Sequence, residues 1–245
     1  MKLFAVTVCH MSSDTVAMSL AAFNRTTLNI RPCNHIIVSH HWPLETNYHQ
    51  NICSIAKMVD GDVIQPEKNL GGHGGVTFAL EHIKNEYTPE YDDVILLYDP
   101  DSIPAKSGWL EAMLSVMIAD PNMAYVSLTH EAIKDNFKGH IPTLIGGQMV
   151  ITDKLDMVNV TLWRAGFLMS EGLLANSTHY GHIEVPMHEK ALKEYRYHGY
   201  MADWYELQCP LAHPKEYSEW KRLHASGVVK VNFDEYAREL KPHQV

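Results

Sequence analysis

Two aspartates separated by one residue follow an apolar run near the middle of the chain. Residues 94–98 are aliphatic or aromatic, and Asp99 and Asp101 come directly after them. A short apolar run bounded by turn residues indicates a buried strand, so both carboxylates are expected at its carboxyl end, where open α/β sheets bind ligands. Two converging carboxylates suit a hard cation, Mg²⁺ or Mn²⁺, that carries a phosphate. A solvated Asp-Pro turn is the alternative interpretation of the same residues.

A glycine-rich segment precedes the aspartates in the chain. Asn69 is followed by Gly71, Gly72, Gly74 and Gly75, and a helical pattern begins directly after them. Glycine lets the backbone approach a ligand closely, and the first turn of a helix presents N–H groups to an anion. The segment is therefore predicted to bind the phosphates of a ligand.

Several common motifs of nucleotide-binding proteins and hydrolases are missing or misplaced in the sequence. A dinucleotide fingerprint would follow the first strand, whereas the glycine-rich segment follows the third predicted strand and has Thr77 in place of the last glycine. The sequence contains no P-loop, no H-E-x-x-H and no G-x-S-x-G. Hydride transfer is therefore disfavoured, as are the usual forms of P-loop, zincin and hydrolase chemistry.

Predicted strands alternate with predicted helices through most of the chain. This alternation favours βαβ units, a mainly parallel sheet and an α/β fold. The strands are expected at 3–9, 35–39, 62–65, 94–98, 124–128 and 143–151, with another within 199–211. The helices are expected at about 14–23, 51–58, 76–83, 109–118, 155–160 and 162–168, and from Pro186 to Gly199.

The size and composition are typical of one globular domain. The chain has 245 residues, of which 46% are hydrophobic and 20% charged, so it can bury a large core. Its formal net charge of -9 disfavours duplex nucleic acid as a partner. The cysteines are scattered, the apolar N-terminal run is too short for a signal peptide, and no stretch is long enough to span a bilayer. These features predict a cytoplasmic protein.

The chain resembles the inverting glycosyltransferases of family two, which have the GT-A fold. The resemblance runs from about residue 3 to about residue 222 and is most specific in residues 69–75 and 97–104. There an Asn-x-Gly-Gly-x-Gly-Gly segment precedes an Asp-x-Asp-Ser segment, as in the rhamnosyltransferase and galactofuranosyltransferase branch. The resemblance implies a GT-A-like (Rossmann-like), mostly parallel sheet flanked by helices in a single domain, 1–245. Within it, about 1–125 would bind the nucleotide sugar, about 126–225 the acceptor, and 226–245 would form a C-terminal tail.

The resemblance also implies roles for acidic residues. Asp99 is expected to contact the ribose or the sugar of the donor, and Asp101 to bind Mn²⁺ or Mg²⁺ on the diphosphate. That cation would absorb the negative charge of the departing nucleoside diphosphate. Glu184 lies just before a predicted helix, where the family places its general base, and would take the proton from an acceptor hydroxyl. The family commonly has a Glu-Asp pair at this place, whereas this chain has Glu184 without the second acid. Asp203 and Glu171 are the other candidates for the base.

Other positions of the family pattern would bind the donor. The β-like run at the N-terminus would line the nucleoside pocket, the glycine-rich segment would hold the diphosphate, and basic residues near the C-terminus could reach diphosphate oxygens. The expected donor-binding residues are Thr7, Cys9, His10, Asn69, Gly71, Gly72, Gly74, Gly75, Lys215 and Arg222. His213 is expected to complete the metal site with Asp101.

The acceptor site is predicted from two features of the second half. Gly146 and Gly147 interrupt a predicted strand, and they mark a bulge or a close approach of the backbone to a ligand. Trp163 is a candidate for stacking on a sugar ring. The expected partners are a UDP- or dTDP-linked sugar and an acceptor hydroxyl on a glycan, a protein or another molecule.

Two other classes of function stay open. A nucleotidyltransferase of similar fold also needs paired carboxylates and a glycine-rich loop, but it usually carries that loop after the first strand. Residues 11–14 contain neither glycine nor a cationic side chain at that place. A non-catalytic sugar- or nucleotide-binding module would tolerate the loss of Glu184.

Overall fold

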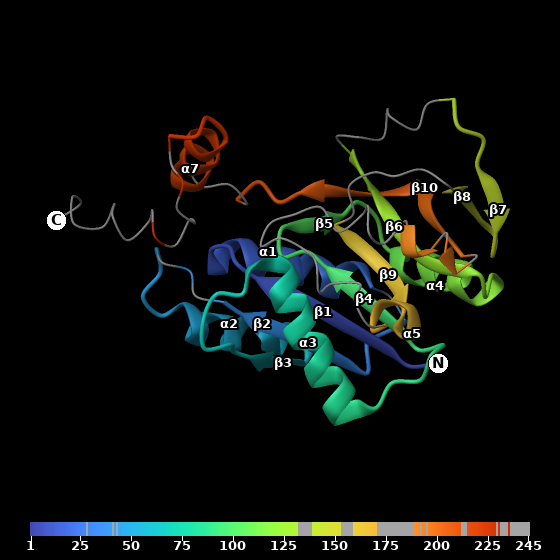
Figure 1. The fold of residues 1–245 in the computed structure, drawn as a ribbon, viewed down its shortest axis with the longest axis horizontal. Coiled ribbons are helices and arrows are strands. Elements are labelled where there is room, and N and C mark those ends of the chain that lie inside the picture. The colour runs from blue at the N-terminus through green and yellow to red at the C-terminus, as the bar shows by residue number, and fades with distance from the viewer. Residues whose placement is uncertain are drawn as a thin grey trace.

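The computed structural model describes residues 1–27, 29–40, 42, 44–131, 139–152, 159–170, 189–191, 193–194, 196–211, 215–228, 230 and 235. Ten strands among these residues form one mixed sheet (Figure 1). They are β1 (Leu3–Cys9), β2 (Asn34–Ser39), β3 (Gly61–Ile64), β4 (Val94–Tyr98), β5 (Ser102–Pro104), β6 (Met123–His130), β7 (Thr143–Ile145), β8 (Gln148–Thr152), β9 (Val160–Arg164) and β10 (Tyr197–Gln208). Their order across the sheet is β3-β2-β1-β4-β9-β6-β10-β8-β7, and β5 pairs with β10 outside this path.

The described helices connect and cover these strands. They are α1 (Ser13–Thr26), α2 (Tyr48–Ala56), the short 3₁₀ helix η1 (Lys57–Val59), α3 (Gly71–Tyr87), α4 (Trp109–Ala119), α5 (Ala165–Leu168) and α7 (Lys215–Ala225). Figure 1 shows α3 lying across β1 and β2 on one face of the sheet. No helix in the described ranges combines the length and the apolar character needed to cross a lipid bilayer.

Most strands point in the same direction. β1 is parallel to both β2 and β4, β2 is parallel to β3, and β6 is parallel to β10. β9 is antiparallel to both β4 and β6, so these two strands also share a direction. The carboxyl ends of β1, β2, β4 and β10 consequently lie along one edge of the sheet. The predicted α/β class, with a mostly parallel sheet flanked by helices, is confirmed.

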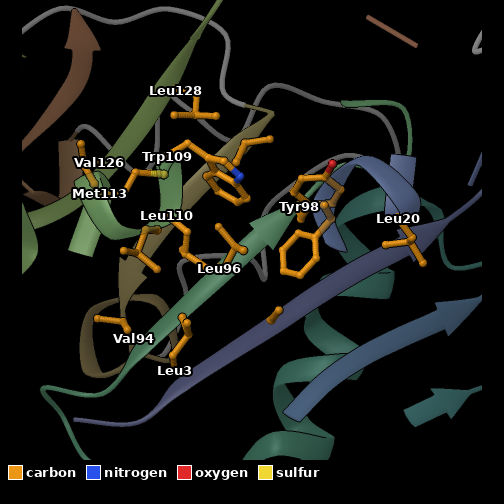
Figure 2. Packing of buried hydrophobic residues seen from close by; sticks show 14 of the residues in the cluster. Leu3, Leu20, Val94, Leu96, Tyr98, Trp109, Leu110, Met113, Val126 and Leu128 are labelled. Carbon is orange, nitrogen blue, oxygen red and sulfur yellow. The ribbon is translucent and has the colours of Figure 1, made fainter. Parts of the chain in front are cut away.

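Alternating side chains of the central strands pack on opposite faces of the sheet. Leu3 of β1 joins the apolar side chains of α1, α2 and α4, whereas the next residue, Phe4, joins those of α3 and α5. Figure 2 shows Tyr98 of β4 near Trp109 of α4 in the first of these clusters, where their ring centroids are 6.1 Å apart. Because both faces are covered, the central strands are continuous apolar runs, which made them recognisable in the sequence.

Three predictions for the second half are wrong in part. Residues 143–151 form two strands, because Gly146 and Gly147 adopt φ angles of 56° and 78° and make a two-residue hairpin turn. Residues 160–164 form β9 rather than part of a helix, since this run is buried between β4 and β6, and periodicity alone cannot distinguish such a run from a buried helix. Gly199 does not end a helix, as predicted, but lies inside β10, where a Cβ atom would come within 2.3 Å of a β8 side chain.

Candidate active site

The turn that carries Asp99 and Asp101 follows β4 and is fixed by buried hydrogen bonds. The Tyr98 hydroxyl donates to the Ser102 carbonyl oxygen at 2.7 Å, and the Ser19 hydroxyl of α1 donates to the same oxygen at 2.8 Å. The Ser102 N–H closes the turn on the Asp99 carbonyl oxygen at 3.2 Å. Burial raises the pKa of Tyr98, so its hydroxyl keeps its proton. The two aspartates therefore belong to an anchored turn rather than to a solvated loop.

Asp101 is also tied to the end of β10. β5 continues from the turn and pairs antiparallel with β10, and the Cys209 N–H donates to the Asp101 carbonyl oxygen at 2.7 Å. The side-chain amide of Gln208 donates to Asp101 Oδ2. Asp101 is only 9% exposed. An amide that holds one oxygen of a carboxylate also fixes the orientation of the other oxygen. This arrangement fits the binding of a hard divalent cation.

A second buried carboxyl group, Glu206 of β10, was not identified from the sequence. Glu206 is 1% exposed. Burial raises its pKa to about 8, the side chains of Ser102 and Asn159 lower it in part, and the charge of Asp101 raises it. Neither carboxyl oxygen makes a well-aligned hydrogen bond with a described residue. Because its pKa lies above neutrality, most Glu206 side chains are protonated at pH 7. A single acid within a strand pattern carries no sequence signal for such a position.

The glycine-rich segment forms the first turn of α3 rather than a loop before it. α3 begins at Gly71, whose φ is 72° and whose N–H donates to Asn69 Oδ1 at 2.8 Å. A Cβ atom at Gly75 would come within 2.5 Å of Val8 Cγ1, so glycine permits α3 to pack closely on β1. At Gly72 a Cβ atom would meet no atom within 4 Å, so the space beside the helix start is open.

The helix start and the acidic turn share the carboxyl edge of the sheet. A Cβ atom at Gly75 would also approach the ring of His40, which directly follows β2. β2, β1 and β4 are successive neighbours, and strands are spaced about 4.8 Å apart, so β2 and β4 are roughly 10 Å apart. The first turn of α3 and the turn that carries Asp101 therefore lie at the same edge of the sheet, as the binding of one diphosphate by both would require.

Two predicted nucleoside-pocket residues of β1 face the core instead. Thr7 is fully buried and hydrogen-bonds to His35 Nε2 at 2.9 Å. Cys9 is also fully buried, and burial raises the pKa of its thiol. Both side chains point to the face covered by α1 and α2, because they share the alternation that begins at Leu3. His10, just after the strand, is half-buried, and its Nδ1 donates to the Val8 carbonyl oxygen at 2.9 Å.

The predicted acceptor residues have structural roles. Trp163 is 0% exposed, stacks on Tyr125 with centroids 3.9 Å apart, and donates from Nε1 to Thr161 Oγ1 at 2.6 Å. A ring without accessible surface cannot stack on a sugar, so this prediction is wrong. Gly146 and Gly147 are accounted for by the β7–β8 hairpin turn, which packs against α4.

The remaining predicted residues lie on α7, on β10 or outside the described residues. Arg222 is exposed on α7 and donates to both carboxylate oxygens of Glu219, at 2.6 Å and 3.0 Å. Lys215 is the first residue of α7, and Asp203 is exposed on β10. Glu184, Glu171 and His213 lie outside the described residues. Within the described ranges, no three His, Cys, Asp or Glu side chains are grouped so that they could hold a metal ion.

Comparison with known proteins identifies the fold. No protein-family model matches the sequence, and no curated protein is significantly similar to it. The mannosyltransferase PcManGT from Pyrobaculum calidifontis, in complex with GDP-Man and Mn²⁺, superposes with a TM-score of 0.63 and 12% identity over 91% of this chain and 61% of that one. S. aureus TarS 1-349, in complex with UDP-GlcNAc, superposes with a TM-score of 0.56 and 12% identity over 96% of this chain and 69% of that one.

These similarities show that the chain has the GT-A-like α/β fold. The chain spans 61% of the length of the mannosyltransferase structure. Another structure of S. aureus TarS superposes with a TM-score of 0.57 and 13% identity, over 96% of this chain but only 41% of that one.

Proposed function

We propose that the protein is a metal-dependent inverting glycosyltransferase that moves a sugar from a nucleoside-diphosphate sugar to an acceptor hydroxyl. One observation carries the proposal: the acidic turn is anchored at the carboxyl edge of the sheet, and the glycine-rich α3 begins at the same edge. The fold is shared with structures that hold GDP-Man with Mn²⁺ or UDP-GlcNAc, which supports a nucleotide sugar as the donor.

In this proposal the chain's own side chains hold the donor and move one proton. Asp101 and His213 would hold Mn²⁺ or Mg²⁺, which when bound neutralises charge on the departing diphosphate. Asp99 would orient the ribose or the sugar, and Glu184 would accept the proton of the acceptor hydroxyl as it attacks the anomeric carbon. The open space at Gly72 leaves the N–H groups of the first turn of α3 accessible to the diphosphate.

The proposal also specifies the base and the sugar of the donor. UDP and dTDP are the expected nucleotides, and the motif pair in residues 69–75 and 97–104 favours a donor of the rhamnosyl or galactofuranosyl kind. The acceptor would be a hydroxyl on a glycan, a protein or another molecule. A cytoplasmic location belongs to the same proposal, and it is supported by the free thiols of Cys9, Cys33, Cys53 and Cys209.

Thermal unfolding with Mn²⁺ and a nucleoside diphosphate tests the donor site. At a hundred times its dissociation constant a ligand stabilises the native state by about 2.7 kcal/mol, which raises the Tm of a chain this long by about 5–11 °C. We expect UDP or dTDP with Mn²⁺ to give such a shift, and Asp101→Asn to abolish the Mn²⁺-dependent part. Asp62→Asn, at an exposed position of β3, is the matched control. An unchanged response of Asp101→Asn would refute the metal assignment.

Gln208 provides a second test of the metal site. Residues that orient a metal ligand typically change metal affinity by 10–100-fold. Gln208→Leu removes the amide that holds Asp101 Oδ2, so Mn²⁺ should bind at least 10-fold more weakly while Asp101 is still present. Titration calorimetry with Mn²⁺ in the presence of UDP measures the change, and an equal affinity in the variant would argue against this orienting role.

Turnover separates the enzyme from the non-catalytic alternative. Glu184→Gln should keep the thermal shift with nucleotide and Mn²⁺ but lose transfer by about 10²-fold or more, because a general base contributes that much. Glu86→Gln, on the exposed surface of α3, should transfer normally. Release of nucleoside diphosphate identifies glycosyl transfer, and release of pyrophosphate would identify a nucleotidyltransferase. Full transfer by Glu184→Gln would exclude Glu184 as the base.

A further inference from the structure

The last part of β10 lies beside the acidic turn of residues 99–102. β10 pairs regularly with β5 here, and Glu206 and Gln208 are two residues apart in this ladder. Side chains two residues apart in a strand lie on the same face. The Gln208 amide contacts Asp101 Oδ2, so the Glu206 carboxyl group also lies on the face of β10 that adjoins the acidic turn.

The Glu206 carboxyl group adjoins two residues that hold Asp99 in the turn. The side chains of Ser102 and Asn159 lie close enough to lower the pKa of this carboxyl group, although neither is well aligned for a hydrogen bond with it. The Asp99 N–H donates to the Asn159 carbonyl oxygen, and the Ser102 N–H donates to the Asp99 carbonyl oxygen, both at 3.2 Å. Glu206 therefore lies next to the residues that hold the backbone of Asp99 on both sides.

A carboxyl group at this position lowers the stability of the fold. Glu206 is 1% exposed, and a buried polar group without aligned partners is destabilising. Replacing buried polar or charged groups by apolar side chains of similar volume often leaves a protein equally stable or more stable. Leucine could therefore fill the space beside the turn. Because activity commonly requires side chains that reduce stability, the burial of an acid here indicates a role in function.

We propose that Glu206 is a positioning residue of the metal site: by hydrogen bonding to the side chains of Ser102 and Asn159, it fixes the acidic turn and thereby the place of Asp101. Gln208 orients the Asp101 carboxylate, whereas Glu206 holds the backbone that carries it. The buried Glu206 side chain acts through these residues and does not touch the donor. The inference rests on the proposed function only in naming the cation and the nucleotide as the ligands of this turn.

Hydrogen exchange of the Asp99 and Ser102 N–H groups, followed by NMR with a chelator present, tests whether Glu206 fixes the turn. In Glu206→Leu these groups should exchange about 10-fold faster than in the wild type, relative to N–H groups of β1 that report opening of the whole fold. Glu206→Gln keeps the shape of the side chain and can donate and accept hydrogen bonds, so it should retain the wild-type exchange. Thr26→Val removes a buried hydroxyl from the last residue of α1 and is the matched control.

Binding of Mn²⁺ in the presence of UDP tests the consequence for the metal site. Titration calorimetry should show Mn²⁺ binding about 10-fold more weakly, or worse, to Glu206→Leu, because residues that orient a metal site change its affinity by about 10–100-fold. Glu206→Gln and Thr26→Val should bind as the wild type does. Glu206→Asp is one methylene too short to contact both partners and should bind as weakly as Glu206→Leu, so it provides the test if Glu206→Leu does not fold.

The outcomes separate this inference from the proposed function. If the wild type binds neither UDP nor Mn²⁺, the glycosyltransferase proposal falls, and hydrogen exchange still decides whether Glu206 fixes the turn. Wild-type exchange in Glu206→Leu and Glu206→Asp would refute the positioning role. Faster exchange with undiminished Mn²⁺ binding would refute it too, because the turn would not govern the metal site. Equal losses in Glu206→Gln and Glu206→Leu would refute the hydrogen bonding on which the role depends.

Discussion

Glu206→Gln should make the protein more stable at pH 8 than the wild type, by an amount that follows from the burial of this carboxyl group. Burial raises the native pKa of Glu206 to about 8, compared with 4.5 for an unperturbed glutamate. The native state therefore holds this proton more tightly than the unfolded chain does. The resulting stabilisation is fully present below pH 4.5 and is lost as pH rises towards 8. Each pH unit in this range costs about 1.4 kcal/mol, so the wild type should lose about 2 kcal/mol between pH 6.5 and 8.

Urea unfolding at pH 6.5 and pH 8.0 measures this loss, with a chelator present to keep cations from the neighbouring Asp101. Glutamine does not titrate, so the free energy of unfolding of Glu206→Gln should lack the 2 kcal/mol decrease, which corresponds to about 4–8 °C in Tm. Glu86→Gln makes the same chemical change on the exposed surface of α3 and should keep the wild-type slope. An equal change of the free energy of unfolding with pH in the wild type and in Glu206→Gln would show that Glu206 is ionised in the native protein and would refute the reasoning.

Four further substitutions have defined outcomes. Gly75→Ala should destabilise the protein by about 1–3 kcal/mol, because its Cβ atom would meet Val8 and His40. Gly72→Ala should leave the free energy of unfolding equal or higher, but it should weaken UDP binding by filling the open space beside α3. An equal affinity of Gly72→Ala for UDP would contradict the phosphate-binding role of this segment. Arg164→Met should cost about 2–4 kcal/mol in urea unfolding, since the guanidinium donates to three carbonyl oxygens at 2.6–2.9 Å near the end of α4, and a loss under 1 kcal/mol would contradict this. Burial lowers the pKa of His35 to about 3. The stabilisation from its neutral ring is therefore fully present above pH 6.5, and the free energy of unfolding should fall by about 2 kcal/mol between pH 6.5 and 5. His35→Gln should remove this pH dependence, and an unchanged pH dependence in the variant would be inconsistent with a neutral buried ring.

The first half of the fold could be predicted closely from the sequence. The run 3–9 is β1 to the residue, and 94–98 is β4, because strands covered on both faces read as continuous apolar runs bounded by turn residues. The helix expected at about 14–23 is α1, Ser13–Thr26. Ser12 caps its start by accepting a hydrogen bond from the Thr15 N–H.

The second half could be predicted less well, because its elements depend on their neighbours. β9 reads like a buried helix until β4 and β6 are placed on either side of it, and this misreading made Trp163 look like a surface aromatic. The hairpin at Gly146 and Gly147 required the pairing of β7 with β8 to be recognised. Side-chain direction along β1 was also missed, since Thr7 and Cys9 differ from their neighbours only in which face they point to.

The sequence by itself determined the α/β class, the central strands and the segments that bring acids and glycines to strand ends, because these follow from local apolar runs and turn residues. Only the tertiary structure decided how those segments meet. It made the glycines the first turn of α3 against β1, and it anchored Asp101 through Gln208 and Cys209, which are far away in the chain. It also buried Glu206 near Asp101. The physical reason is that burial, pKa shifts and long-range hydrogen bonds depend on groups brought together by folding, which no local pattern of residues records.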